Sequence, residues 1–186
     1  MATVRTYSVL GSQTVGAAGA ASVTFSAIPQ NYTDLKVSIS ARTNRAFTVD
    51  GILISFNGSA TSFSLKYLEG DGTSAYSGTL AQFAGDATGA NATASTFGNS
   101  EIVIPNYTSS NNKSYSADGT TENNATGSIS DLIAGLWSNS AAITSITLTP
   151  NVGTSFNQYS TFVLYGIKNT DKFSKASGGI ITQDNI

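Results

Sequence analysis

The sequence contains no histidine and no cysteine in its 186 residues. Without histidine the chain lacks the usual general base at neutral pH and the commonest metal ligand, so serine–histidine–acid triads and histidine-based zinc hydrolysis are excluded. Without cysteine there are no disulfides, thiolate metal sites or thiol nucleophiles. Two carboxylates can still cleave a glycoside, but the spacing of the 11 acidic residues favours no pair. We therefore expect no enzyme activity, no cofactor and no metal site.

Charge is scarce as well, with 11% charged residues and a formal net charge of -2. Nucleic acids and anionic membranes attract clustered lysine and arginine, so the sequence predicts neither partner. No apolar run reaches the roughly 18 residues of a membrane-spanning helix. The first residues, Met1 to Arg5, lack the charged-then-apolar layout of a signal peptide. We expect synthesis in a cytoplasm, with any external location reached by assembly or lysis.

Apolar and polar residues alternate along much of the chain, which is typical of strands with one buried face. The clearest case is Leu35 to Arg42, and similar runs end at the turn signals Asn57-Gly58 and Glu69-Gly70-Asp71-Gly72. Asn-Gly suits a tight hairpin because both residues tolerate positive φ. The acids Glu69 and Asp71 are oxygen ligands in principle, but calcium needs six to eight oxygens, so turn chemistry is the favoured interpretation.

Two runs are apolar on both faces, Ile129–Trp137 and Tyr159–Ile167. Such runs favour central strands whose outer face is covered by another segment or by another subunit. One helical turn is the alternative for the first run.

Small residues fill the stretch from Ala84 to Thr96, which predicts a long exposed polar loop. With short strands and turns at regular intervals, the fold class is an all-β antiparallel β-sandwich, and a jelly-roll-like arrangement is favoured. The domain is expected to span residues 1–168, with residues 1–20 forming either a strand or an N-terminal arm. Residues 169–186 are expected to form a polar C-terminal tail outside the sandwich.

Aromatic residues give the candidate binding positions. Trp137 and Tyr115 are candidates for stacking against a glycan, although core packing is the favoured interpretation for such residues. Tyr159, Val163 and Tyr165 are candidates for an oligomer interface, because they lie on the run that is apolar on both faces.

Several segments together resemble a set of tailed-bacteriophage virion proteins that includes capsid decoration (cement) proteins and tail-fibre domains. The resemblance spans about Val23 to Lys168, and the segments that carry it are Ile28–Leu35, Ile104–Tyr107, Leu136–Ser138, Ile143–Leu148, Tyr159–Thr161 and Leu164–Ile167. It implies a β-sandwich that works as an oligomer, often a homotrimer, and it brings no catalytic residues. The expected function is a decoration protein on the outer surface of the phage head, made in the host cytoplasm and bound to the major capsid protein. The alternative is a receptor-binding or glycan-binding module of a fibre, which would contact a glycan of the host surface.

Overall fold

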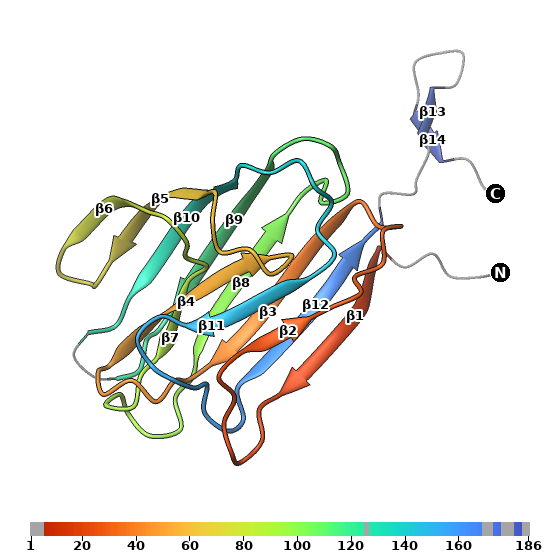
Figure 1. Cartoon of the computed structure of the whole chain (residues 1–186). Coiled ribbons are helices and arrows are strands. Elements are labelled where there is room, and N and C mark those ends of the chain that lie inside the picture. Colours follow the sequence, from red (N-terminus) through yellow and green to blue (C-terminus); the bar gives the residue numbers. More distant parts are fainter. Residues whose placement is uncertain (1–5, 125–126, 169–172, 176–180, 184–186) are drawn as a thin grey trace.

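The computed structural model describes residues 6–124, 127–168, 173–175 and 181–183, and it forms two antiparallel sheets packed face to face (Figure 1). The large sheet has eight strands in the order β1, β12, β3, β8, β9, β10, β5, β6. In that order they span Tyr7–Thr14, Thr161–Ile167, Asp34–Ala41, Gly98–Ile104, Lys113–Thr120, Ser130–Trp137, Phe63–Gly70 and Ala75–Leu80. The small sheet has four strands, β2, β11, β4 and β7. These span Val23–Phe25, Ile146–Pro150, Val49–Phe56 and Asp86–Thr88.

This architecture confirms the predicted all-β antiparallel sandwich, whereas the narrower jelly-roll arrangement stays a prediction. Among the described residues, no helix is long and apolar enough to cross a membrane. The short strands β13 (Phe173–Lys175) and β14 (Ile181–Gln183) pair with each other and belong to neither sheet of the sandwich. The other residues between 169 and 186 lie outside the described part of the chain.

The core lies between the sheets and follows the alternation in the sequence. On β3 the residues Leu35, Val37, Ile39 and Ala41 are buried and the residues between them are half-buried. They join Ile52, Ile54 and Phe56 of β4, among others, in one apolar cluster. Each large aliphatic side chain buried in this way stabilises the fold by about 1.5–3 kcal/mol, so strand register is set by which face the apolar residues occupy.

The N-terminal segment belongs to the sandwich. Tyr7–Thr14 forms β1, which pairs antiparallel with β12 at one edge of the large sheet. The alternative of an arm over residues 1–20 is therefore wrong for this stretch, because its backbone groups are used in the sheet; residues 1–5 lie outside the described part of the chain.

The segment Ala84–Thr96 is not the long exposed loop that its small residues predict. Ala84 is fully buried, and Asp86–Thr88 forms β7, which pairs with β4 in the small sheet. The side chain of Arg42 holds most of the remainder: Nη1 donates to the carbonyls of Thr93 and Thr96, and Nη2 to those of Ala90 and Ala92. Small side chains in this segment allow neighbouring segments to approach closely, so they serve packing and do not indicate an exposed loop.

Both runs that are apolar on two faces form central strands of the large sheet. The run Ile129–Trp137 contains β10, between β9 and β5, and the alternative of a helical turn is wrong. The run Tyr159–Ile167 contains β12, between β1 and β3. Within the described chain one face of each strand packs on the core, and the other face is at least partly open to solvent.

The Asn57-Gly58 turn is tight, as predicted, but it does not join neighbouring strands of one sheet. Both residues have positive φ, and Phe56 and Ser59 exchange backbone hydrogen bonds across the turn. β4 before it lies in the small sheet and β5 after it in the large sheet. The turn therefore starts the crossover from one layer to the other.

Candidate functional site

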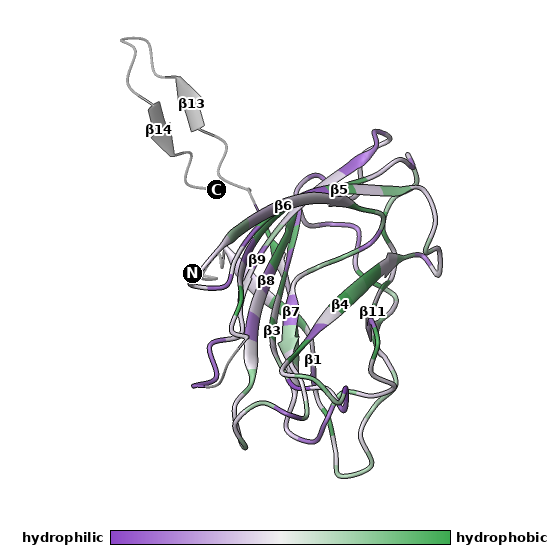
Figure 2. Cartoon of the chain, turned by 90° about the vertical axis from the view of Figure 1, so that its left-hand side faces the viewer, coloured by the Kyte–Doolittle hydropathy of each residue, from purple (hydrophilic) through white to green (hydrophobic). Residues whose placement is uncertain are grey.

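The large sheet has one face on the core and one face turned away from the small sheet, which we call the outer face (Figure 2). Along β10 the alternate residues Asp131, Ile133 and Trp137 are buried, so Leu132 and Ala134 point to the outer face. The same alternation defines outer-face residues on the neighbouring strands. No second layer of the described residues covers this face, which belongs to the larger of the two sheets.

A shallow groove of about 640 Å³ runs over the outer face on β5, β6, β9 and β10. At its centre Leu132 and Leu68 are direct cross-strand partners, and they are 61% and 60% exposed. The next row holds Ala134 opposite Lys66, whose Nζ donates to Thr79 Oγ1 at 2.6 Å. Two adjacent leucines that are both mostly in water, within a groove rimmed by polar residues, are typical of a protein-contact surface.

A second apolar area occupies the other end of the outer face. Val163 and Tyr165 of β12 are half-buried, and the Tyr165 ring packs edge-on against Tyr7 of β1 with centroids 6.3 Å apart. Val9, the cross-strand partner of Tyr165, is 61% exposed. Two of the three predicted interface residues therefore lie together on an open face, and their role in an interface stays a prediction.

Tyr159, the third predicted interface residue, lies away from that face. It is 67% exposed, in the loop before β12, where it borders a hollow shared with Gly19 and Phe97. Its φ of 72° is positive, and its backbone N–H donates to the Val15 carbonyl. The tight turn at this residue, rather than the strand alternation, decides where its ring points.

The prediction that Trp137 and Tyr115 contact a glycan is wrong, because both residues are in the core, at 1% and 3% exposure. Trp137 packs against Phe56 and Phe63 with ring centroids 5.5 and 6.1 Å away. The Tyr115 hydroxyl donates to the Phe83 carbonyl at 3.0 Å. Both rings point inward, so the favoured interpretation of core packing is confirmed.

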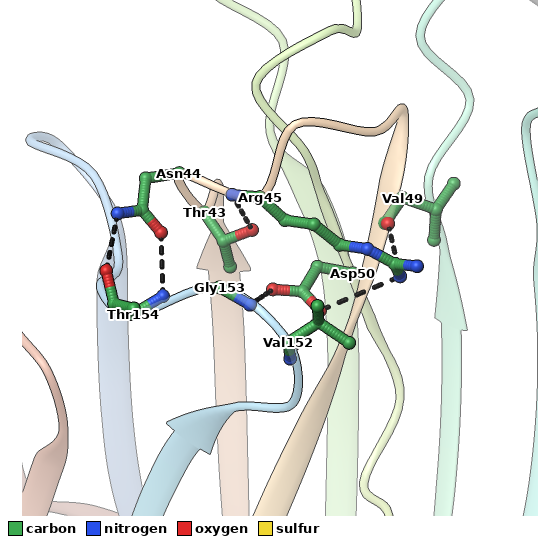
Figure 3. Close-up of polar contacts among 8 residues, drawn as sticks. All are labelled: Thr43, Asn44, Arg45, Val49, Asp50, Val152, Gly153 and Thr154. Carbon is green, nitrogen blue, oxygen red and sulfur yellow. Dashed lines mark hydrogen bonds and ion pairs between the residues drawn. The ribbon is translucent and has the colours of Figure 1, made fainter.

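Two loops at one end of the sandwich are fixed to each other by the exposed side chain of Asn44 and the buried side chain of Asp50 (Figure 3). Asn44 accepts a hydrogen bond from the Thr154 N–H and donates one to its hydroxyl, each at 2.8 Å. Asp50, which is fully buried, accepts from the N–H groups of Val152 and Gly153. These bonds hold the exposed residues Phe47 and Val152 on rigid loops, which favours recognition.

Beside these loops a pocket of about 200 Å³ opens between the two sheets, and we call it the acidic pocket. Its lining includes Arg45, Phe47, Tyr67, Glu69, Phe83 and Asp86. Burial, followed by repulsion from Asp131 and Glu69, raises the pKa of Asp86 to about 8. Burial also raises the pKa of Asp131 to about 6 and shifts that of Glu69 upward. Asp86 is therefore largely protonated at neutral pH.

The sequence interpretation missed these carboxyl groups, although a signal was present. Successive side chains of a strand point to opposite faces, so Asp131 points to the same face as Ile133 and Trp137, which lie two and six residues further on. Alternation alone therefore places Asp131 on the inward face. Asp86 has no such signal, because it lies among small residues whose pattern predicts a loop.

Metal binding finds no support in the arrangement of acids. Among the residues that the structure describes, no group of three or more acidic side chains is placed to hold a metal ion. Asp71 forms a turn instead: its Oδ1 accepts from the N–H groups of Thr73 and Ser74 at 2.8 and 2.6 Å. The favoured interpretation of the Glu69–Gly72 segment as turn chemistry is confirmed.

Comparison with protein-family models and with curated proteins found no match to this chain.

Proposed function

We propose that this chain is a structural protein of a tailed-phage particle, namely a capsid decoration protein that attaches to the outer surface of the head. The observation that carries the proposal is the pair Leu68 and Leu132, exposed side by side in a groove of the outer face. The resemblance in sequence supplies the phage context. Burying two leucines against the major capsid protein would favour attachment by roughly 3 kcal/mol or more, without any catalytic group.

The test uses phage heads that lack the protein and measures binding of the purified chain by cosedimentation. Replacing Leu68→Ser and Leu132→Ser together is expected to weaken binding at least tenfold, since about 1.4 kcal/mol corresponds to a factor of ten. The matched control is Val152→Ser, which removes an equally exposed apolar side chain from a loop, and it should bind like the parent chain. Unchanged binding of the double variant would reject the outer face as the attachment surface.

A receptor-binding or glycan-binding module of a fibre is the second candidate, and the fixed loops at the end of the sandwich favour it. Phe47 is 55% exposed and its ring lies 5.0 Å from the Arg45 guanidinium carbon. An exposed aromatic ring on a rigid loop is suited to stacking on a sugar face. Glycan-array binding that Phe47→Ala removes and Tyr7→Ala leaves intact would support this function, and a lack of binding to host envelope glycans would reject it.

A further inference from the structure

The acidic pocket contains a carboxyl group without a hydrogen-bond partner. Asp86 lines the pocket and is 6% exposed, and no group in the described part of the chain donates a hydrogen bond to its side chain. The carboxyl of the neighbouring Asp131 is also buried and accepts no hydrogen bond of good geometry from the described residues, although the Gly119 backbone N–H lies close enough to favour its ionised form. Buried polar groups are nearly always paired, so an unpaired carboxyl at the wall of a pocket points to a ligand that supplies the missing donors.

Carboxyl groups that act on Asp86 outnumber the basic groups that do so. Repulsion from Asp131 on β10, Glu69 on β5 and Asp50 on β4 raises the pKa of Asp86 on β7, whereas the Arg45 guanidinium lowers it. Arg45 is already engaged, because its Nη1 lies 3.8 Å from Asp50 Oδ1 and donates to the Val49 carbonyl at 3.0 Å. A buried carboxyl without a counter-charge takes up a proton, and the same position would accept a cationic donor instead.

The size and lining of the pocket narrow the class of cation. A volume of about 200 Å³ is smaller than the roughly 300–1,000 Å³ of pockets for drug-sized ligands. Calcium would need six to eight oxygen ligands, and no group of three or more acidic side chains among the described residues is placed to hold a metal ion. Tyr67, Phe83 and the exposed Phe47 give the pocket aromatic walls, and aromatic rings attract ammonium and guanidinium groups.

We propose that the acidic pocket binds an ammonium or guanidinium group, as carried by a lysine or arginine side chain, with the Asp86 and Glu69 carboxylates accepting its hydrogen bonds. The apolar stem of the ligand would lie against Phe47 and Tyr67. This inference does not depend on a place in a phage particle.

Binding of a cation to this pocket must be coupled to loss of a proton. Asp86 holds its proton up to about pH 8 without the ligand, and a bound cation favours the ionised carboxylate. Affinity should therefore rise between pH 6 and pH 8, by up to about tenfold per pH unit for one proton released. A neutral ligand would not show this rise.

The experiment titrates the isotopically labelled full chain with Nα-acetyl-lysine methylamide at pH 6, 7 and 8, and follows amide chemical shifts by NMR. Shifts are expected at residues around the pocket, with affinity increasing with pH, and the Nε-acetylated form of the same ligand should not bind. Asp86→Asn and Glu69→Gln should each weaken binding at least tenfold. Both should fold, because an amide replaces carboxyls whose neutral form burial already favours.

The matched control is Glu122→Gln, which removes an exposed acid that does not line the pocket and should leave binding unchanged. If the capped lysine binds more tightly than n-butylammonium, the natural ligand is a side chain of a partner protein. If n-butylammonium binds more tightly, the natural ligand is a free amine. Both outcomes support a cation site. Binding that is independent of pH, or equal in Asp86→Asn, would overturn the proposal. Pocket shifts caused by calcium ions but not by any amine would overturn it as well.

Discussion

At the residue scale, tyrosine rings repeatedly lie over glycines of a neighbouring strand. Tyr115 on β9 covers Gly135 on β10, and Tyr67 on β5 covers Gly78 on β6. A Cβ atom added to Gly135 would lie 2.1 Å from the Tyr115 ring. These glycines are needed for the space that they leave, which lets a large ring lie flat inside a thin sandwich.

We predict that Gly135→Ala destabilises the fold by about 1–3 kcal/mol, because an extra methyl group in a filled core forces side chains and backbone apart. Urea unfolding measures the loss. The control Gly16→Ala should change stability little, since nothing lies within 4 Å of the added methyl group. Equal stability of the two variants would show that the Tyr115 ring can move aside.

The acidic pocket predicts how stability depends on pH. The folded chain holds protons on Asp86 and Asp131 up to about pH 8 and 6, whereas the unfolded chain releases them near the ordinary aspartate pKa of 3.8. The stability from these groups is fully present below about pH 4. It is lost as pH rises toward 8, at up to about 1.4 kcal/mol per pH unit for each proton.

Chemical denaturation at pH 5, 6, 7 and 8 tests this prediction. Asp86→Asn should flatten the decline between pH 6 and 8, while the exposed control Glu122→Gln should keep it. A parent chain whose stability is level or increases over that range would contradict the raised pKa of Asp86.

At the scale of elements, one buried arginine organises the loop that follows β7. Arg42 is 9% exposed and donates to four backbone carbonyls between residues 90 and 96. Those carbonyls lie in an irregular segment, where no sheet ladder is present to satisfy them. The Arg42 guanidinium donates hydrogen bonds to the backbone carbonyls of this loop, whereas the backbone of β7 is paired with the neighbouring strand β4.

We predict that Arg42→Met destabilises the chain by roughly 2–3 kcal/mol, since hydrogen bonds from a charged donor are lost and carbonyls are left unpaired. Hydrogen exchange of the amides between residues 90 and 97 should speed up more than exchange in β3. Lys66→Met, which removes a cation from the exposed side of β5, should leave that exchange unchanged. Uniform loss of protection in both variants would contradict a local role for Arg42.

At the scale of the whole molecule, the outer face combines two apolar ends with a polar middle. Lys36 and Glu101 form an ion pair of 2.7 Å between the leucine groove and the area around Tyr165. If the proposed function holds, the two separate apolar areas would let one surface contact the capsid and the other contact further copies of the chain.

We predict a homotrimer at micromolar concentration, measured by analytical ultracentrifugation, as the family resemblance implies. Val163→Ser combined with Tyr165→Ser should shift the chain toward monomer, because these side chains lie together on the open face of β12. The control pair Leu68→Ser and Leu132→Ser should stay trimeric if the groove serves the capsid. A monomeric parent chain would contradict the trimer.

The sequence by itself determined the fold class, the strands with one buried face and the turn chemistry. The reason is that period-two alternation and turn residues act locally: the buried side of β3 and the Asp71 turn both follow from neighbouring residues. The lack of histidine and cysteine likewise narrowed the available chemistry without any fold.

Only the tertiary structure decided which elements meet. It placed Asp86–Thr88 in the small sheet as β7, turned Trp137 and Tyr115 inward, and separated Tyr159 from Val163 and Tyr165. It also brought Asp86 within electrostatic range of Glu69 and Asp131, which come from two other strands. Such contacts depend on the order of strands in each sheet and on the space that a glycine leaves for an aromatic ring. The local sequence pattern of one segment determines neither of these.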